Sequence, residues 1–181
     1  MSNVYKQVQV GNVVLKVEFD HDAESPREWD NLGKMVCWHR RYNLGDDHDF
    51  ESPSDFQREI NERNAIILPL YLYDHSGITM NTTGFSCPWD SGQVGYIYAL
   101  KEDIKREYGV KRISKKLKEM VERRLVAEVE VYDQFIRGNT FGFVLEDEDG
   151  NEIDSCWGFI GDDFNENGMK DYLPEEFREA I

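Results

Sequence analysis

The chain has few cysteines and no long apolar segment. Its three cysteines, Cys37, Cys87 and Cys156, lie far apart and form neither a CxxC pair nor an even set. This pattern excludes a disulfide framework and favours a reducing compartment. No run approaches the roughly 20 apolar residues of a membrane span, and the polar start of the chain predicts no signal peptide. We therefore expect a soluble cytoplasmic protein without membrane contact.

Short signatures of the common enzyme classes are also missing. The sequence contains no GxSxG, HExxH, GxxxxGK or GxGxxG. These motifs mark α/β hydrolases, zinc proteases and nucleotide-binding folds. No such activity is therefore predicted at the level of a motif, and function has to be argued from less specific groupings of residues.

Basic residues are scarce, and they are unevenly placed. The chain has 21 basic and 36 acidic residues, a net charge of −15. Residues 101–124 carry 10 basic and 5 acidic side chains, whereas residues 125–181 carry 3 basic and 16 acidic ones. Direct contact with nucleic acid is therefore expected only through 101–124, because phosphate requires a basic surface. The acidic last third either attracts a basic protein surface or serves solubility alone.

Apolar patterns predict an α+β fold. Alternation around Gly11-Asn12 and around the turn at 149–151 indicates two β-hairpins. The run 65–73 is typical of a buried strand, although Pro69 argues for an edge or a bulge, and 93–100 reads as another strand. Helices are expected over 53–63, over 100–109 and after the cap at Ser114.

These elements predict a mainly antiparallel or mixed sheet of about six strands with three or four helices. We expect one domain over residues 1–181, since no linker-like tract or repeat interrupts it. Its expected parts are an N-terminal hairpin (4–19), a distinctive central segment (25–108), a long helix (about 114–137) and an acidic C-terminal hairpin with a tail (139–181).

Three segments place an aspartate shortly before a glycine, with an aromatic residue just upstream: 29–33, 73–77 and 88–95. If the strands 65–73 and 93–100 are neighbours, Asp74, His75 and Asp90 lie near adjoining strand ends. Two carboxylates and a histidine suit a catalytic site that uses a divalent cation, with Asp74 and Asp90 as metal ligands. The alternative is that both aspartates accept backbone N–H groups and only shape turns.

Two further groupings are weaker. Cys37 and His39 lie about 7 Å apart if they share one face of a strand, too far for a direct hydrogen bond. A buried structural cysteine is the simpler interpretation. The acidic run that begins at Asp162 has Asn167 at its sixth position, where a calcium-binding EF-hand loop requires glycine.

The amino-acid sequence of the central segment resembles that of a family of small, mostly uncharacterised proteins from phages and mobile elements. The similar stretches cover roughly residues 24–108 and are EWDNLG (28–33), CWHRRYNLGD (37–46), LPLYLYDHSGIT (68–79) and PWDSGQVGYIY (88–98). The resemblance brings no catalytic residue. It implies an accessory role, since small acidic phage proteins include inhibitors of restriction enzymes and of CRISPR nucleases, some of which resemble DNA in charge.

The leading hypothesis is therefore a phage-encoded inhibitor that contacts a host defence nuclease, as a nucleic-acid mimic. The expected partner-binding residues are the carboxylates of the C-terminal third and an arginine pair beside Trp38: Glu146, Asp147, Glu148, Asp149, Asp162, Asp163, Arg40 and Arg41. The first alternative is a metal-dependent nuclease or hydrolase centred on Asp74, His75 and Asp90. The second is a structural or regulatory protein without catalysis.

Overall fold

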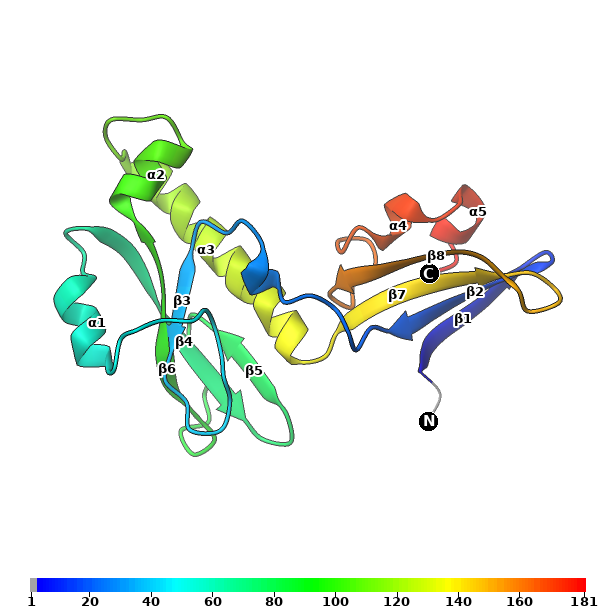
Figure 1. Cartoon of the computed structure of the whole chain (residues 1–181), viewed down its shortest axis with the longest axis horizontal. Coiled ribbons are helices and arrows are strands. Elements are labelled where there is room, and N and C mark those ends of the chain that lie inside the picture. Colours follow the sequence, from blue (N-terminus) through cyan, green and yellow to red (C-terminus); the bar gives the residue numbers. More distant parts are fainter. Residues whose placement is uncertain (1–2) are drawn as a thin grey trace. The chain divides into compact units, whose positions relative to one another are not determined.

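The computed structural model describes residues 3–181, which form two compact units (Figure 1). The terminal unit consists of residues 3–25 and 134–181, and the central unit consists of residues 26–133. The α+β class expected from the sequence is confirmed. Where the sequence suggested one sheet of about six strands in one domain, the described residues form eight strands in two four-stranded sheets, one in each unit.

The terminal unit pairs the first hairpin of the chain with the last one. Its antiparallel sheet has the order β1-β2-β7-β8, with β1 (Val4–Val10), β2 (Val13–Phe19), β7 (Thr140–Glu146) and β8 (Glu152–Ile160). Gly11 has a φ of +58° and Gly150 a φ of +79°, which is why glycine stands in each of the two hairpin turns. Both hairpins predicted from the sequence are therefore present.

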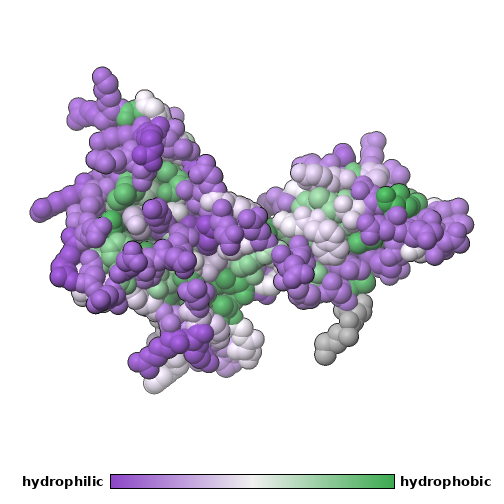
Figure 2. All heavy atoms as spheres, in the orientation of Figure 1, coloured by the Kyte–Doolittle hydropathy of each residue, from purple (hydrophilic) through white to green (hydrophobic). Residues whose placement is uncertain are grey.

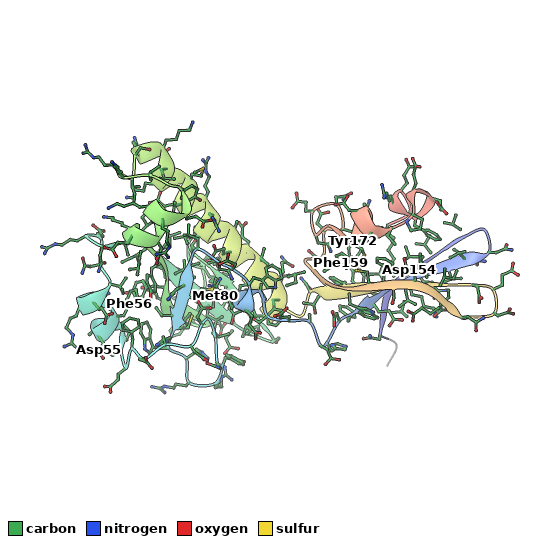
Figure 3. The ribbon with its side chains drawn as sticks, turned by 45° about the horizontal axis from the view of Figure 1, so that its top comes forward. Asp55, Phe56, Met80, Asp154, Phe159 and Tyr172 are labelled. Atoms are coloured by element: carbon green, nitrogen blue, oxygen red, sulfur yellow. The ribbon has the colours of Figure 1, made fainter. Side chains whose placement is uncertain are left out.

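One face of this sheet forms the core of the terminal unit. Leu15 and Val17 on β2 are fully buried together with Phe141 and Phe143 on β7. Two short helices, α4 (Met169–Tyr172) and α5 (Glu175–Arg178), and the turn between them contribute further buried side chains to the same cluster: Met169, Leu173 and Phe177. Phe159 on β8 and Tyr172 on α4 lie beside each other, with 5.5 Å between ring centroids (Figure 3).

The central unit contains the second antiparallel sheet, in the order β3-β6-β4-β5, and the longer helices. A 3₁₀ turn at Pro26–Glu28 opens the unit. The strands are β3 (Lys34–Cys37), β4 (Ala65–Asp74), β5 (Ile78–Asn81) and β6 (Ser91–Leu100). The helices are α1 (Pro53–Glu59), α2 (Lys101–Glu107) and α3 (Lys115–Ile136), the last turn of which falls in the terminal unit.

Helices α1 and α3 lie on opposite sides of the central sheet (Figure 1). Phe56 lies on the sheet side of α1 (Figure 3), and its ring stacks on Tyr96 at 5.0 Å between centroids. The buried face of α3 repeats every four residues, as an amphipathic helix requires: Leu117, Val121, Leu125 and Val129. Helix α1 ends at Glu59 instead of the expected Arg63, because Ile60 turns to an extended conformation and is buried.

Pro69 sits within β4, and the pairing explains how the strand tolerates it. Strand β6 runs beside β4 along its length, but β5 pairs only with residues 71–74. At Pro69 the strand therefore has a single neighbour, and the side without one needs no backbone N–H. The proline marks a local edge inside an otherwise central strand.

The first aspartate–glycine segment serves packing. The side chain of Arg27 is only 5% exposed and forms ion pairs with Asp46 at 2.9 Å and with Glu128 on α3 at 3.5 Å. The amides of Leu32 and Gly33 both donate to the Glu128 carboxylate. These bonds hold residues 27–33 against α3, and they place this segment in a structural cluster of the central unit.

Candidate functional site

A cleft of about 640 Å³ opens where β4 ends and β6 begins in the central unit. The backbone amide of Asp74 donates to the carbonyl of Asp90 at 2.8 Å, so the two strand ends adjoin as expected. The cleft is lined by residues from three of the four segments that carry the resemblance: Trp38, His39, Arg40, Arg41, Leu72, Asp74, Trp89, Asp90, Ser91, Gly92, Gln93 and Val94.

The carboxylate of Asp74 is paired with a cationic side chain of the cleft. Its carboxylate forms an ion pair with the guanidinium of Arg41 and accepts a hydrogen bond from the Tyr42 hydroxyl at 3.3 Å. Arg41 also lies over the Tyr42 ring, 5.4 Å from its centroid. A carboxylate with these partners is neutralised, and Asp74 is therefore not presented as a free base or as an open metal ligand.

Asp90 has a different set of partners. Its Oδ2 lies 3.5 Å from Nδ1 of His75 and accepts a weak hydrogen bond from the Cys87 thiol, also at 3.5 Å. His75 is mostly exposed and does not line the cleft. The structure thus brings Asp74 and Asp90 into one cleft but turns each carboxylate to its own neighbours.

The metal hypothesis gains no support from this geometry. Within residues 3–181 no group of three or more histidine, cysteine, aspartate or glutamate side chains is arranged to hold a metal ion. The carboxylate of Asp163, in the acidic run that begins at Asp162, accepts the backbone N–H of Asn165, which lowers the pKa of Asp163. The acidic run that begins at Asp162 is explained by turn formation and by exposed charge.

Cys37 is not an activated nucleophile. Burial, with the nearby Asp46 carboxylate, raises the pKa of its thiol to about 12. His39 is occupied elsewhere, since its Nδ1 accepts the backbone amides of Arg41 and Tyr42, both at 3.3 Å. A working cysteine needs the opposite, a lowered pKa beside a histidine. The structural interpretation of Cys37 is therefore the one that fits.

We expect iodoacetamide at pH 8 to alkylate Cys37 at least about a hundredfold more slowly than Cys87 or Cys156. A pKa of about 12 leaves roughly one thiolate in ten thousand at that pH, and only the thiolate reacts. Timed alkylation followed by peptide mass spectrometry measures all three cysteines in one sample. Alkylation of Cys37 at the rate of the other two in the folded protein would contradict this prediction.

Two tryptophans in the cleft play different roles. Trp38 is anchored, because its indole N–H donates to the Phe50 carbonyl at 3.0 Å. Trp89 is 92% exposed, an unusual state for so large an apolar side chain. Arg40 is exposed in the same cleft and has no partner among the described residues. Exposed Trp and Arg are the residue types that most often anchor protein interfaces.

The acidic residues predicted to bind a partner fall into two groups in the terminal unit. Glu146 pairs with Lys16 at 2.6 Å, and Asp147 accepts hydrogen bonds from Asn151 that shape the β7–β8 turn and lower the Asp147 pKa. Asp163 shapes its own turn in the same way. The carboxylates of three others have no partner within residues 3–181: Glu148, Asp149 and Asp162.

The two units differ in charge. Residues of the terminal unit include 5 basic and 17 acidic side chains, a net charge of −12, whereas the central unit has 16 and 19, a net charge of −3. The hydrophilic tip of the β7–β8 hairpin is visible in Figure 2. The acidic character of the chain is therefore largely a property of one folded unit.

No family model matches this chain, and no curated protein or solved structure is significantly similar to it. None of the helices in residues 3–181 combines the length and the apolar character needed to cross a membrane.

Sequence reasoning missed the partners that occupy the cleft. The ion pair between Arg41 and Asp74 and the contact from Tyr42 join positions more than thirty residues apart. The sequence showed an arginine pair beside Trp38 and an aspartate at the end of the expected strand 65–73. That signal gives no register, and so it does not say which arginine reaches which aspartate.

Proposed function

We propose that this protein acts by binding another protein, and that its terminal unit docks on a basic surface built to receive nucleic acid. The observation that carries the proposal is the net charge of −12 on the terminal unit, with Glu148, Asp149 and Asp162 free of any partner among the described residues. A basic groove that receives phosphates is complementary to such a surface. The same charge repels nucleic acid itself.

The partner that we propose is a host defence nuclease. The protein would bind it in the cytoplasm of the host cell. The resemblance of residues 24–108 to phage and mobile-element proteins supports this choice, because acidic inhibitors of that origin occupy nucleic-acid channels. In the central unit, Trp89 and Arg40 offer a second, independent contact of the type found at protein interfaces. Arg41 does not contact the partner directly in this proposal, since its guanidinium is paired with Asp74.

The proposal predicts a salt-dependent inhibitor. The protein should bind and inhibit a nuclease from a panel of restriction and CRISPR enzymes at about 50 mM salt, and should do so less well at about 300 mM, where surface charges are screened. Removing three free charges in the variant Glu148→Gln/Asp149→Asn/Asp162→Asn should weaken binding by about tenfold or more, at somewhat under 1 kcal/mol per exposed charge. Cleavage assays and calorimetry measure the two effects.

A matched variant tests whether location or total charge matters. Asp30→Asn/Asp47→Asn/Glu51→Gln removes the same charge from the central unit, at positions whose carboxylates have no partner among residues 3–181. We expect this variant to inhibit almost as well as the unmodified protein. Equal weakening by both variants would show that net charge alone acts, and an absence of inhibition across the panel at low salt would overturn the proposal.

A further inference from the structure

A second cavity in the central unit is basic. It has a volume of about 580 Å³ and lies between the start of β4, helix α2 and the loop that leads into α3. Six cationic side chains line it, against two carboxylates: Lys101, Lys105, Lys111, Arg112, Lys115 and Lys118, with Glu62 and Glu122. Figure 2 shows hydrophilic side chains covering this end of the central unit. The cavity is separate from the cleft at Asp74 and shares none of its lining residues.

Three of the six cations have no hydrogen-bond or ion-pair partner among the described residues. Lys118 pairs with Glu122 at 3.6 Å, Lys115 approaches Glu119 at 4.0 Å, and Lys101 donates to two backbone carbonyls. The charged groups of Lys105, Lys111 and Arg112 have no partner among the described residues. These exposed side chains line one cavity, and a concave surface lined by charges of one sign concentrates counter-ions. The cavity therefore favours a ligand with roughly three negative charges.

The rest of the lining indicates the size and kind of that ligand. Ala65, Ile66, Ile67 and Ile113 supply an aliphatic wall, and no aromatic side chain of the described part of the chain lines the cavity. Single-stranded nucleic acid is usually held by bases stacked on aromatic rings along an open groove, which this site does not offer. A volume of about 580 Å³ is typical of a small-molecule pocket. Arg112 supplies the forked donor that suits phosphate oxygens, and the lysines supply point charges.

We propose that this cavity binds a small phosphorylated molecule with a diphosphate or an equally charged group. Lys105, Lys111 and Arg112 neutralise the phosphates, and the aliphatic wall contacts the remainder of the ligand. Ser114, which caps the start of α3, also lines the cavity, so the positive end of the α3 dipole lies beside it. The site does not depend on the partner proposed for the terminal unit.

Calorimetry on the full chain with inorganic pyrophosphate and with adenosine diphosphate tests this site. We expect saturable binding with a Kd below about 1 mM for at least one of these probes at about 50 mM salt. The variant Lys111→Gln/Arg112→Gln should weaken that binding at least about tenfold. The variant Lys116→Gln/Arg123→Gln is the matched control, because it removes the same charge from exposed neighbours that do not line the cavity; it should change the Kd by less than about threefold.

Three results would overturn the proposal. The first is the absence of saturable binding for both probes up to about 10 mM, which is beyond any useful affinity. The second is equal weakening by the two variants, which would reduce the effect to overall charge. The third is binding of a short single-stranded oligonucleotide about tenfold or more tighter than either probe, which would make the cavity part of a nucleic-acid surface. Circular dichroism of both variants shows whether they fold.

Discussion

Replacing Gly95 with alanine is expected to destabilise the central unit by about 3 kcal/mol, whereas the same change at Gly92 should alter its stability by less than about 1 kcal/mol. Both glycines lie on β6, and neither needs a positive φ. A β-carbon at Gly95 would lie 1.9 Å from the Val36 carbonyl oxygen and 2.9 Å from Cα of Cys37. A β-carbon at Gly92 meets nothing within 4 Å.

The cost at Gly95 arises because the obstructing atoms are backbone. Gly95 is directly opposite Cys37 in the β3–β6 pair, and the next amide, that of Trp38, donates to the Val94 carbonyl at 2.8 Å. Relieving the clash requires β3 and β6 to separate. This separation breaks backbone hydrogen bonds beside the Asp74 cleft, which Trp38 and Val94 line. A flexible side chain would simply move aside, but a paired strand does not.

Hydrogen exchange during urea denaturation measures the effect separately in the two units. Peptides from residues 26–133 should lose protection at lower urea in Gly95→Ala than in Gly92→Ala, while peptides from the terminal unit serve as an internal reference. Equal protection in the two variants would contradict the close approach of β3 to β6 at this position.

Local signals explain which elements the sequence predicted. The two hairpins are determined by alternation and turn glycines, and α3 is determined by Ser114 at one end, Gly138 at the other and an apolar face between them. These features lie within about twenty residues of one another, so a sequence shows them directly. Strand β5, four residues of ordinary composition, has no such signal and was not expected.

The division into two units depends on a contact that no local pattern reveals. Strand β2 pairs with β7, and the register joins Leu15 to Leu145 across 130 residues. Two hairpins with similar alternation fit one six-stranded sheet as well as they fit a separate four-stranded one, since edge strands look alike in sequence. The expectation of a single domain followed from the absence of a linker, and here the chain passes between units within an ordered helix and a short loop.

For the same reason, the sequence predicted where the aspartates of the candidate cleft lie but not which side chains they contact. Pairing of the runs 65–73 and 93–100 places Asp74 and Asp90 at one end of the sheet, as the structure shows. Which side chain each carboxylate contacts depends on the path of the loops 38–44 and 75–90. The sequence suggested a shared metal, and in the structure Asp74 contacts Arg41 while Asp90 contacts His75.

Substituting methionine for Arg27 should destabilise the central unit by about 3 to 5 kcal/mol, the usual cost of leaving a buried charge without its partner. The guanidinium pairs with both Asp46 and Glu128 and donates to the Gly33 carbonyl at 2.6 Å, so its loss frees two carboxylates that are largely enclosed. Methionine is apolar and of similar length, which keeps the packing. Arg58→Met is the control, since Arg58 is 77% exposed and its one ion pair within residues 3–181 is with Asp55; it should cost less than about 1 kcal/mol.

The loss of stability caused by Arg27→Met should become smaller as the pH falls toward 4. Burial raises the pKa of Glu128 above its ordinary 4.5. The charge of Arg27 and the hydrogen bonds from Leu32 and Gly33 act in the opposite direction and limit this rise. A group with a raised folded pKa contributes stability that is present below its unfolded pKa and lost as the pH rises through the folded value. Without Arg27 the folded pKa rises further, so more stability is lost by neutral pH than in the unmodified protein. Urea denaturation of both proteins between pH 4 and pH 7 measures this; a deficit that is constant across the range would mean that packing, and not the buried charge, sets the cost.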